Sequence, residues 1–165
     1  MPLTDTVMYE EQLGQINTVL TRLRSEANSR AAFLIDRNGQ QIAATGEDLD
    51  QVDATALASL TAGNVASTDA IAKLIGEKAF SALVHEGDKD NLHISLVNDR
   101  IILVILFDER SSLGLVRLRV RKASGDLVHI FEVLDQRHAA EIARGAVNSS
   151  PFSEITDDDI DSLFA

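Results

Sequence analysis

The segment IILVILF, residues 101–107, is apolar at every position. A strand with one face in water alternates apolar and polar residues, whereas a strand covered on both faces is a continuous apolar run. We therefore predict that residues 101–107 form a central strand of a sheet. Two more strand-like segments precede it, FSALVHE at 80–86 and NLHISLVN at 91–98, and polar turns at 87–90 and 98–99 separate the three.

A hairpin is predicted further upstream. AAFLID at 31–36 and QQIAAT at 40–45 have strand-like composition, and Asn38-Gly39 lies between them. Asn and Gly adopt a positive φ at low cost, as a tight hairpin turn requires. The sheet is therefore expected to have five strands, two from this hairpin and three from residues 80–107.

Three segments have the three-and-four spacing of apolar residues that is typical of amphipathic helices. They run from about Thr6 to Asn28, from about Asp53 to Ile75, and onward from Leu113, and Gly76 stands where a helix-ending glycine is expected. The apolar positions of the first and third segments are Leu13, Ile16, Leu20, Leu23 and Ala27, and Leu113, Val116, Val120, Ala123, Leu127, Ile130 and Leu134.

The predicted order is α-β-β-α-β-β-β-α, which indicates an α+β sandwich. A five-stranded antiparallel sheet with the second helix on one face and the terminal helices on the other buries every apolar stripe. We expect residues 1–137 to form the domain and residues 138–151 to be a flexible linker, because the periodicity fades there and Gly145 and residues 148–151 favour turns. Residues 152–165 form an acidic amphipathic tail that is expected to contain a short helix.

Composition limits the function classes. The chain has 165 residues, 45% of them apolar, and a net charge of -11, so nucleic acid and anionic membranes are not expected as partners. It has no cysteine, which excludes a disulfide framework and thiol chemistry. Its N-terminus lacks a signal pattern, and no apolar run approaches the length of a membrane span, so a cytoplasmic location is expected.

The sequence contains no established catalytic motif. No phosphate-binding glycine loop is present, and His85 with His93 is too small a set for a metal site. Asp157, Asp159 and Asp161 resemble the start of a calcium loop, but the glycine and the final glutamate of such a loop are missing. We therefore expect no cofactor, no metal site and no catalytic residue in this chain.

The second helix has an unusual face. Winding residues 53–75 at 100° per residue places Leu57, Leu60, Asn64, Ile71 and Ile75 on one side, which we predict to be buried. The opposite side carries the small residues Ser59, Ala62, Ala66 and Ala70. Two interpretations remain: alanine serves helix propensity there, or the small face lets a partner approach closely, which we favour.

The tail, SPFSEITDDDIDSLFA at 150–165, is acidic and yet carries large apolar side chains. Thr156 with Asp159 resembles a capping box, and Ile160, Leu163 and Phe164 would share one face of a short helix. Five acidic residues and no basic one predict a basic acceptor surface. The acceptor is either a partner protein or the chain's own domain, and a third possibility is that the tail stays solvated.

Several segments carry a family resemblance: VMYEE, FLIDRNGQ, ASLTAGNVAS, AKLIGE, ILFDERSSLGLVRLRVRKAS and FSEITDDDIDSLF. With the order of elements, they resemble the Roadblock/dynein light-chain superfamily, and within it the MglB-type regulators of bacterial polarity and gliding motility. The resemblance covers nearly the whole chain and implies a Roadblock-like fold.

The resemblance implies a homodimer of which two protomers bind one Ras-like small GTPase of the MglA type. It also implies that the chain activates GTP hydrolysis without an arginine finger, by rearranging the partner's own catalytic residues, and that it is enriched at a cell pole. GTP and magnesium then belong to the partner. The positions that match the GTPase-docking helix are Ala58, Thr61, Ala62, Val65, Ala66, Asp69, Ala70 and Lys73.

In the same family the C-terminal segment is associated with a second contact to the GTPase and with its nucleotide exchange. The tail-docking residues here are Phe152, Ile155, Ile160, Leu163 and Phe164. A different class of function stays open, a scaffold or adaptor that binds a GTPase or a polar complex without altering hydrolysis. Arg100 and Arg110 flank the central strand, but loop arginines of this kind are usually solvated and do not indicate a finger.

Overall fold

The computed structural model describes residues 9–148. Five antiparallel strands form one sheet in the order β2-β1-β5-β4-β3, with β5 in the middle as predicted. The strands are β1 (Ala31–Asp36), β2 (Gln41–Gly46), β3 (Ala82–Glu86), β4 (Asn91–Leu96) and β5 (Ile101–Phe107). The predicted α+β order of elements is confirmed.

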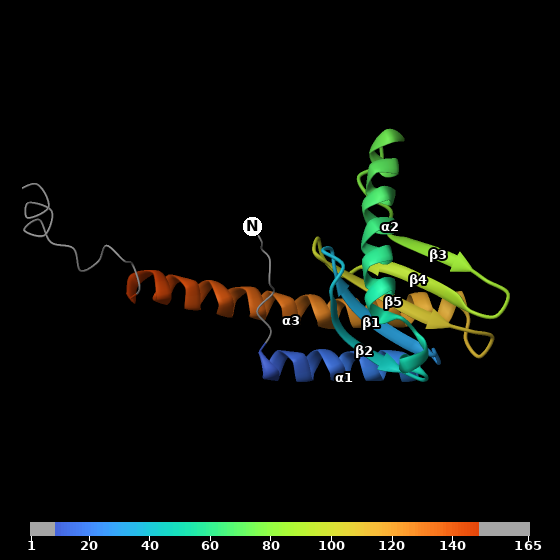
Figure 1. Ribbon diagram of the computed structural model, residues 1–165, viewed down its shortest axis with the longest axis horizontal. Helices are drawn as coiled ribbons and strands as arrows, with labels where there is room; N and C mark the ends of the chain where they lie inside the picture. Colours follow the sequence, from blue (N-terminus) through green and yellow to red (C-terminus); the bar gives the residue numbers. More distant parts are fainter. Residues whose placement is uncertain (1–8, 149–165) are drawn as a thin grey trace, which may run out of the picture. The chain divides into compact units, whose positions relative to one another are not determined.

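Three helices and one short 3-10 turn complete the fold: α1 (Glu10–Glu26), η1 (Leu49–Gln51), α2 (Ala54–Leu74) and α3 (Leu113–Asn148). Figure 1 shows α2 crossing in front of the sheet and the first part of α3 passing behind it. Ion pairs from Arg22 to Asp126 (3.3 Å) and from Glu26 to Arg119 (3.5 Å) join α1 to α3. The two terminal helices therefore lie together on the face opposite α2, as predicted.

The central strand has two buried faces. Ile102 and Val104 pack with Phe33 of β1 and Val65 of α2 on one side. Leu103 and Ile105 alternate with them, are fully buried, and so belong to the face that α1 and α3 cover. The continuous apolar run at 101–107 is explained by this double burial.

The β1–β2 turn contains the predicted Asn38-Gly39 pair, and of the two only Gly39 has a positive φ. Gly39 has φ +87°, and the Asp36 carboxylate accepts hydrogen bonds from the backbone N–H groups of Asn38 and Gln40, both at 2.9 Å. A Cβ at Gly39 would lie 3.1 Å from Ser59 Cα. The glycine therefore serves both the turn and its close approach to α2.

The helix that begins at Leu113 continues to Asn148, so the prediction of a flexible linker over 138–151 is wrong for residues 138–148. The alanines of HAAEIARGAVN favour the helix, and one interior glycine at Gly145 does not outweigh them. Residues 9–130 form one compact unit, and the described part of a second unit is 131–148. The predicted helix in the tail, and the start of the first helix at Thr6, lie outside the described residues.

Candidate functional site

Helix α2 is fixed firmly at both ends. The Asp53 side chain caps its start by accepting a hydrogen bond from the Ala56 N–H at 3.0 Å. Gly76, with φ +80°, follows its end, and the Glu77 N–H returns to the Ala72 carbonyl at 2.9 Å. The helix therefore presents a rigid surface.

The side of α2 that faces the sheet is made of small residues. Ala58, Thr61, Val65 and Ala72 are its buried positions. Small side chains here allow the helix to lie close to a sheet face that Phe33 already fills.

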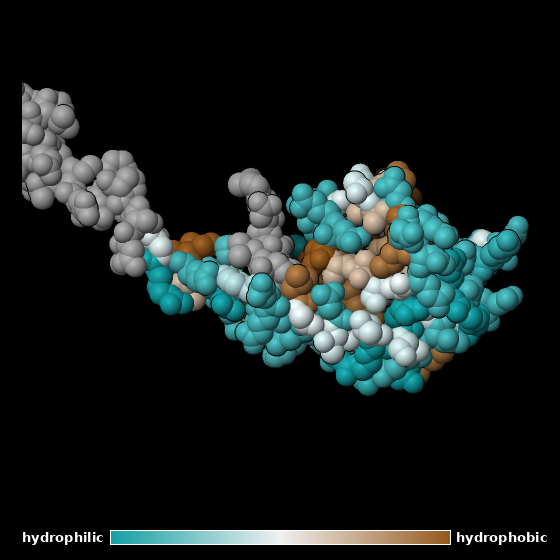
Figure 2. Space-filling view, turned by 60° about the horizontal axis from the view of Figure 1, so that its bottom comes forward, coloured by the Kyte–Doolittle hydropathy of each residue, from teal (hydrophilic) through white to brown (hydrophobic). Residues whose placement is uncertain are grey.

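The predicted orientation of α2 is wrong for its large apolar residues. Leu60 is 74% exposed, Ile71 51% and Ile75 64%, although the winding placed them in the core. The winding assumed that the larger apolar side chains pack inward, whereas the sheet leaves room for the smaller ones. Leu74, 86% exposed, extends the same apolar surface, and Figure 2 shows hydrophobic surface at that end of the helix.

The eight predicted docking positions separate into three groups. Ala58, Thr61 and Val65 are buried in the protomer, so their side chains are not accessible there as docking positions. The side chains of Ala62 and Asp69 are half-buried. The exposed positions are Ala66, Ala70 and Lys73.

Two rows run side by side along the outer surface of α2. At 100° per residue, Ala66, Ala70 and Lys73 form one row, which we call the small row. Leu60, Ile71 and Leu74 are in the neighbouring row, the large row, with Gly63 and Ser67 between them.

Polar contacts show which row lies on which side. Asn64, next to the large row, is 3.2 Å from Nε2 of His85 on β3. Asp69, next to the small row, accepts a 2.7 Å hydrogen bond from Arg37 in the β1–β2 turn. The large row therefore faces the β3 side of the sheet, and the small row faces the hairpin turn.

Strand β3 is an edge of the sheet beside the large row. It pairs only with β4, so within residues 9–148 its other edge has no strand partner. Phe80, 37% exposed, and Leu83 line a shallow depression between β3 and α2 together with Val65 and Thr68. An exposed strand edge next to an apolar helix surface is a typical protein-binding arrangement.

A second apolar stripe was the signal that sequence reasoning missed. Leu60, Ile71 and Leu74 lie on one side of the helix at helical spacing, and Ala58, Val65 and Ala72 lie on the other side. A helix that is apolar on both sides is expected to be buried on both sides. In this unit one side is buried and the other is exposed.

The two strand histidines do not meet. Val84 is opposite His93 and His85 is opposite Leu92, so the two imidazoles project from opposite faces of the sheet. Among residues 9–148 no cluster of metal-ligating side chains is found. His93 is buried, its Nδ1 lacks a hydrogen-bond partner, and burial, with a smaller contribution from Arg117, lowers its pKa.

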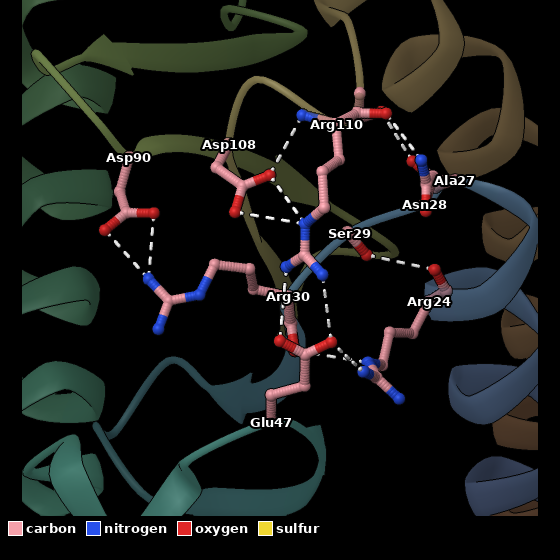
Figure 3. A network of polar contacts seen from close by, with 10 residues as sticks. Arg24, Ala27, Asn28, Ser29, Arg30, Glu47, Asp90, Asp108 and Arg110 are labelled. Carbon is pink, nitrogen blue, oxygen red and sulfur yellow. Dashed lines mark hydrogen bonds and ion pairs between the residues drawn. The ribbon is translucent and has the colours of Figure 1, made fainter.

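Arg110 is held in an ion-pair network. Figure 3 shows its guanidinium between Asp108 and Glu47, at 3.0 Å and 3.2 Å. Arg24 joins the network through Glu47 at 3.0 Å. The hydrogen bond from Arg110 lowers the pKa of both the Glu47 and the Asp108 carboxyl groups. Arg110 therefore ties together the ends of β2 and β5, and this contact supplies a structural role for it.

Among residues 9–148, no helix combines the length and the apolar character needed to cross a membrane.

Comparison with known proteins gives concordant results. A family model described as Roadblock/LC7 domain matches residues 15–107. Myxococcus xanthus MglB is 53% identical, and the match covers 78% of this chain and 96% of that one, with a TM-score of 0.73. A search of curated proteins found no match.

Two further solved structures are similar. The gliding protein MglB of Thermus thermophilus is 34% identical over 79% of this chain and 98% of its own, with a TM-score of 0.73. An MglB described as having a tetrameric arrangement is 32% identical over 81% of this chain and 99% of its own, with a TM-score of 0.75.

Proposed function

The chain belongs to the Roadblock/LC7 domain family, and from this premise we propose that it regulates a Ras-like small GTPase of the MglA type in cell polarity and gliding motility. The observation that carries the proposal is the exposed outer surface of α2, where Leu60, Ile71, Leu74 and Ile75 face solvent on a capped and well-packed helix. An apolar surface of this kind indicates a protein partner. The similarity to MglB proteins supports a role in gliding motility, and the GTPase partner is part of the proposal.

The two rows on α2 suit two different partners. The large row lies beside the open edge of β3, so a second copy of the chain can pack helix against helix and strand against strand across a twofold axis. We propose that this contact forms the homodimer.

The small row remains accessible in such a dimer. Ala66 and Ala70 carry no bulk, so a GTPase backbone can approach them closely, and Lys73 at the end of the row supplies a charged contact. We propose that the paired small rows of two protomers receive one GTPase. Ala62 and Asp69 border this surface, and Ala58, Thr61 and Val65 support it from below.

Activation is proposed to work through binding energy. Arg110 is committed to Glu47 and Asp108 at the ends of β2 and β5. A regulator that binds the hydrolysis-competent conformation of its partner more tightly than the resting one accelerates hydrolysis without a catalytic side chain. A preference of about 1.4 kcal/mol gives a tenfold acceleration. GTP and magnesium are then held by the GTPase.

Single-turnover GTP hydrolysis by an MglA-type GTPase tests the proposal. Two equivalents of the full-length protein are expected to raise the rate, and Ala70→Arg is expected to remove the effect because the new side chain occupies the docking surface. Gln15→Arg, exposed on α1, is the matched control. Binding without acceleration would instead assign the chain to the scaffold class, and equal activity of Ala70→Arg would exclude the small row.

A further inference from the structure

The first part of α3 carries a surface that the proposed function does not use. We call it the basic face and define it by the exposed residues of 117–130, which share one side of the helix. Its members are Arg117, Leu118, Arg121, Lys122, Gly125 and His129. Leu118, 59% exposed, is its apolar centre.

The positive charges of the basic face are unpaired. Within residues 9–148, Arg117, Arg121 and Lys122 form no ion pair, whereas the neighbouring Arg119 is paired with Glu26 at 3.5 Å. Asp126 is the only carboxylate in residues 113–130, and it is paired with Arg22 on α1. An uncompensated basic face is unexpected on a chain with a net charge of -11.

We propose that the acidic segment Glu154–Phe164 of this chain docks on the basic face. The segment has five carboxylates and no basic residue, which matches three unpaired cations. Its apolar residues Ile160, Leu163 and Phe164 match the exposed Leu118. No other acidic partner is delivered at so high an effective concentration as a segment joined to the same chain.

The charge of the whole chain favours this occupant over a polyanion. With a net charge of -11, the protein repels nucleic acid and anionic membranes at long range. This long-range repulsion does not keep an acidic segment of the chain itself away, because the segment is covalently tethered to the domain. The docking goes beyond the proposed function and adds a regulatory step to it, because one segment cannot occupy α3 and a GTPase at the same time.

Cross-linking in the full-length protein tests the docking. The chain has no cysteine, so Gly125→Cys with Ser162→Cys gives a single reactive pair. Gly14→Cys on α1 with Ser162→Cys is the matched control, because both glycines are helical and a Cβ at either meets nothing within 4 Å. A short bismaleimide should join the Gly125 pair about tenfold faster than the Gly14 pair. Products within one chain or between two chains both support the docking, and equal rates would overturn it.

Charge exchange tests the chemistry of the contact. Arg121→Glu with Lys122→Glu should slow the cross-link about tenfold, since tenfold corresponds to about 1.4 kcal/mol and two or three exposed ion pairs supply about that much. Asp157→Lys with Asp159→Lys should slow it equally without altering α3, and the four changes together should restore it. Failure of the tail variant to slow the reaction would refute the contact. Sedimentation with phosphatidylglycerol vesicles that is lost in Arg121→Glu with Lys122→Glu, at an unchanged cross-linking rate, would assign the face to a membrane instead.

Discussion

Replacing Leu74 with serine should weaken the proposed homodimer strongly. The side chain is 86% exposed in the protomer, and full burial of a leucine is worth about 1.5 to 3 kcal/mol. Burying the exposed fraction therefore contributes about 1.3 to 2.6 kcal/mol in each protomer. A twofold axis buries the residue twice, which gives about 2.6 to 5 kcal/mol for the dimer.

At about 1.4 kcal/mol for each factor of ten, the dissociation constant of Leu74→Ser should rise by roughly two to three and a half orders of magnitude. Sedimentation velocity over a concentration series measures it. Leu118→Ser, another exposed leucine on a different helix, is the control and should shift the dissociation constant by no more than a few-fold. A Leu74→Ser dimer within threefold of the wild type would refute the assignment of the large row.

Three further outcomes are expected. Ala70→Arg should abolish binding of an MglA-type GTPase in a pull-down while the melting temperature stays unchanged, because Ala70 is exposed. The pKa of His93 is lowered in the folded protein, so the unfolded chain binds the proton more readily and the free energy of unfolding should fall as the pH drops below about 6.5. Urea unfolding at pH 7.5 and at pH 5.5 measures this fall, which should be smaller in His93→Leu than in His129→Leu. Gly39→Ala should lower the free energy of unfolding by about 1 to 2 kcal/mol, since φ is +87°, whereas Gly14→Ala inside α1 should raise it by about 0.5 to 1 kcal/mol; opposite signs in urea unfolding are the check.

Elements set by local pattern were predictable from the sequence. The run at 101–107 predicts a central strand, because a strand buried on both faces needs apolar residues at its odd and its even positions. The structure confirms this prediction. The Asn38-Gly39 turn and the glycine that ends α2 are also local, because a positive φ selects the residue. In each case the chemistry that decides the structure lies within a few residues.

The orientation of α2 could not be read from the sequence in the same way. Both sides of the helix are apolar, so periodicity offers two solutions, and the volume left above Phe33 decides between them. That volume depends on strands that lie far away in the chain. Of the predicted docking positions, Ala66, Ala70 and Lys73 are exposed for this reason and Ala58 and Val65 are not.

Contacts between residues that lie far apart in the sequence are a second limit on what the sequence predicts. The register of β3 against β4 sends His85 and His93 to opposite faces, and a shift of one residue would have brought them together. Arg110 and Glu47, which pair at 3.2 Å, are distant in sequence. Nothing in the composition of either segment specifies such a partner.

The pairing of β1 with β5 carries a consequence for synthesis of the chain. Ala31–Asp36 finds its second neighbour in Ile101–Phe107, so the centre of the sheet joins segments from opposite parts of the unit. Contacts of such large sequence separation slow folding, because a long loop must close first. While the ribosome has released only α1 and the first hairpin, β1 has no β5 to pair with and Phe33 has no α2 to cover it. Nascent chains stalled before residue 101 are therefore expected to be sensitive to protease and to recruit chaperones, and protection should arise once residue 107 has left the exit tunnel.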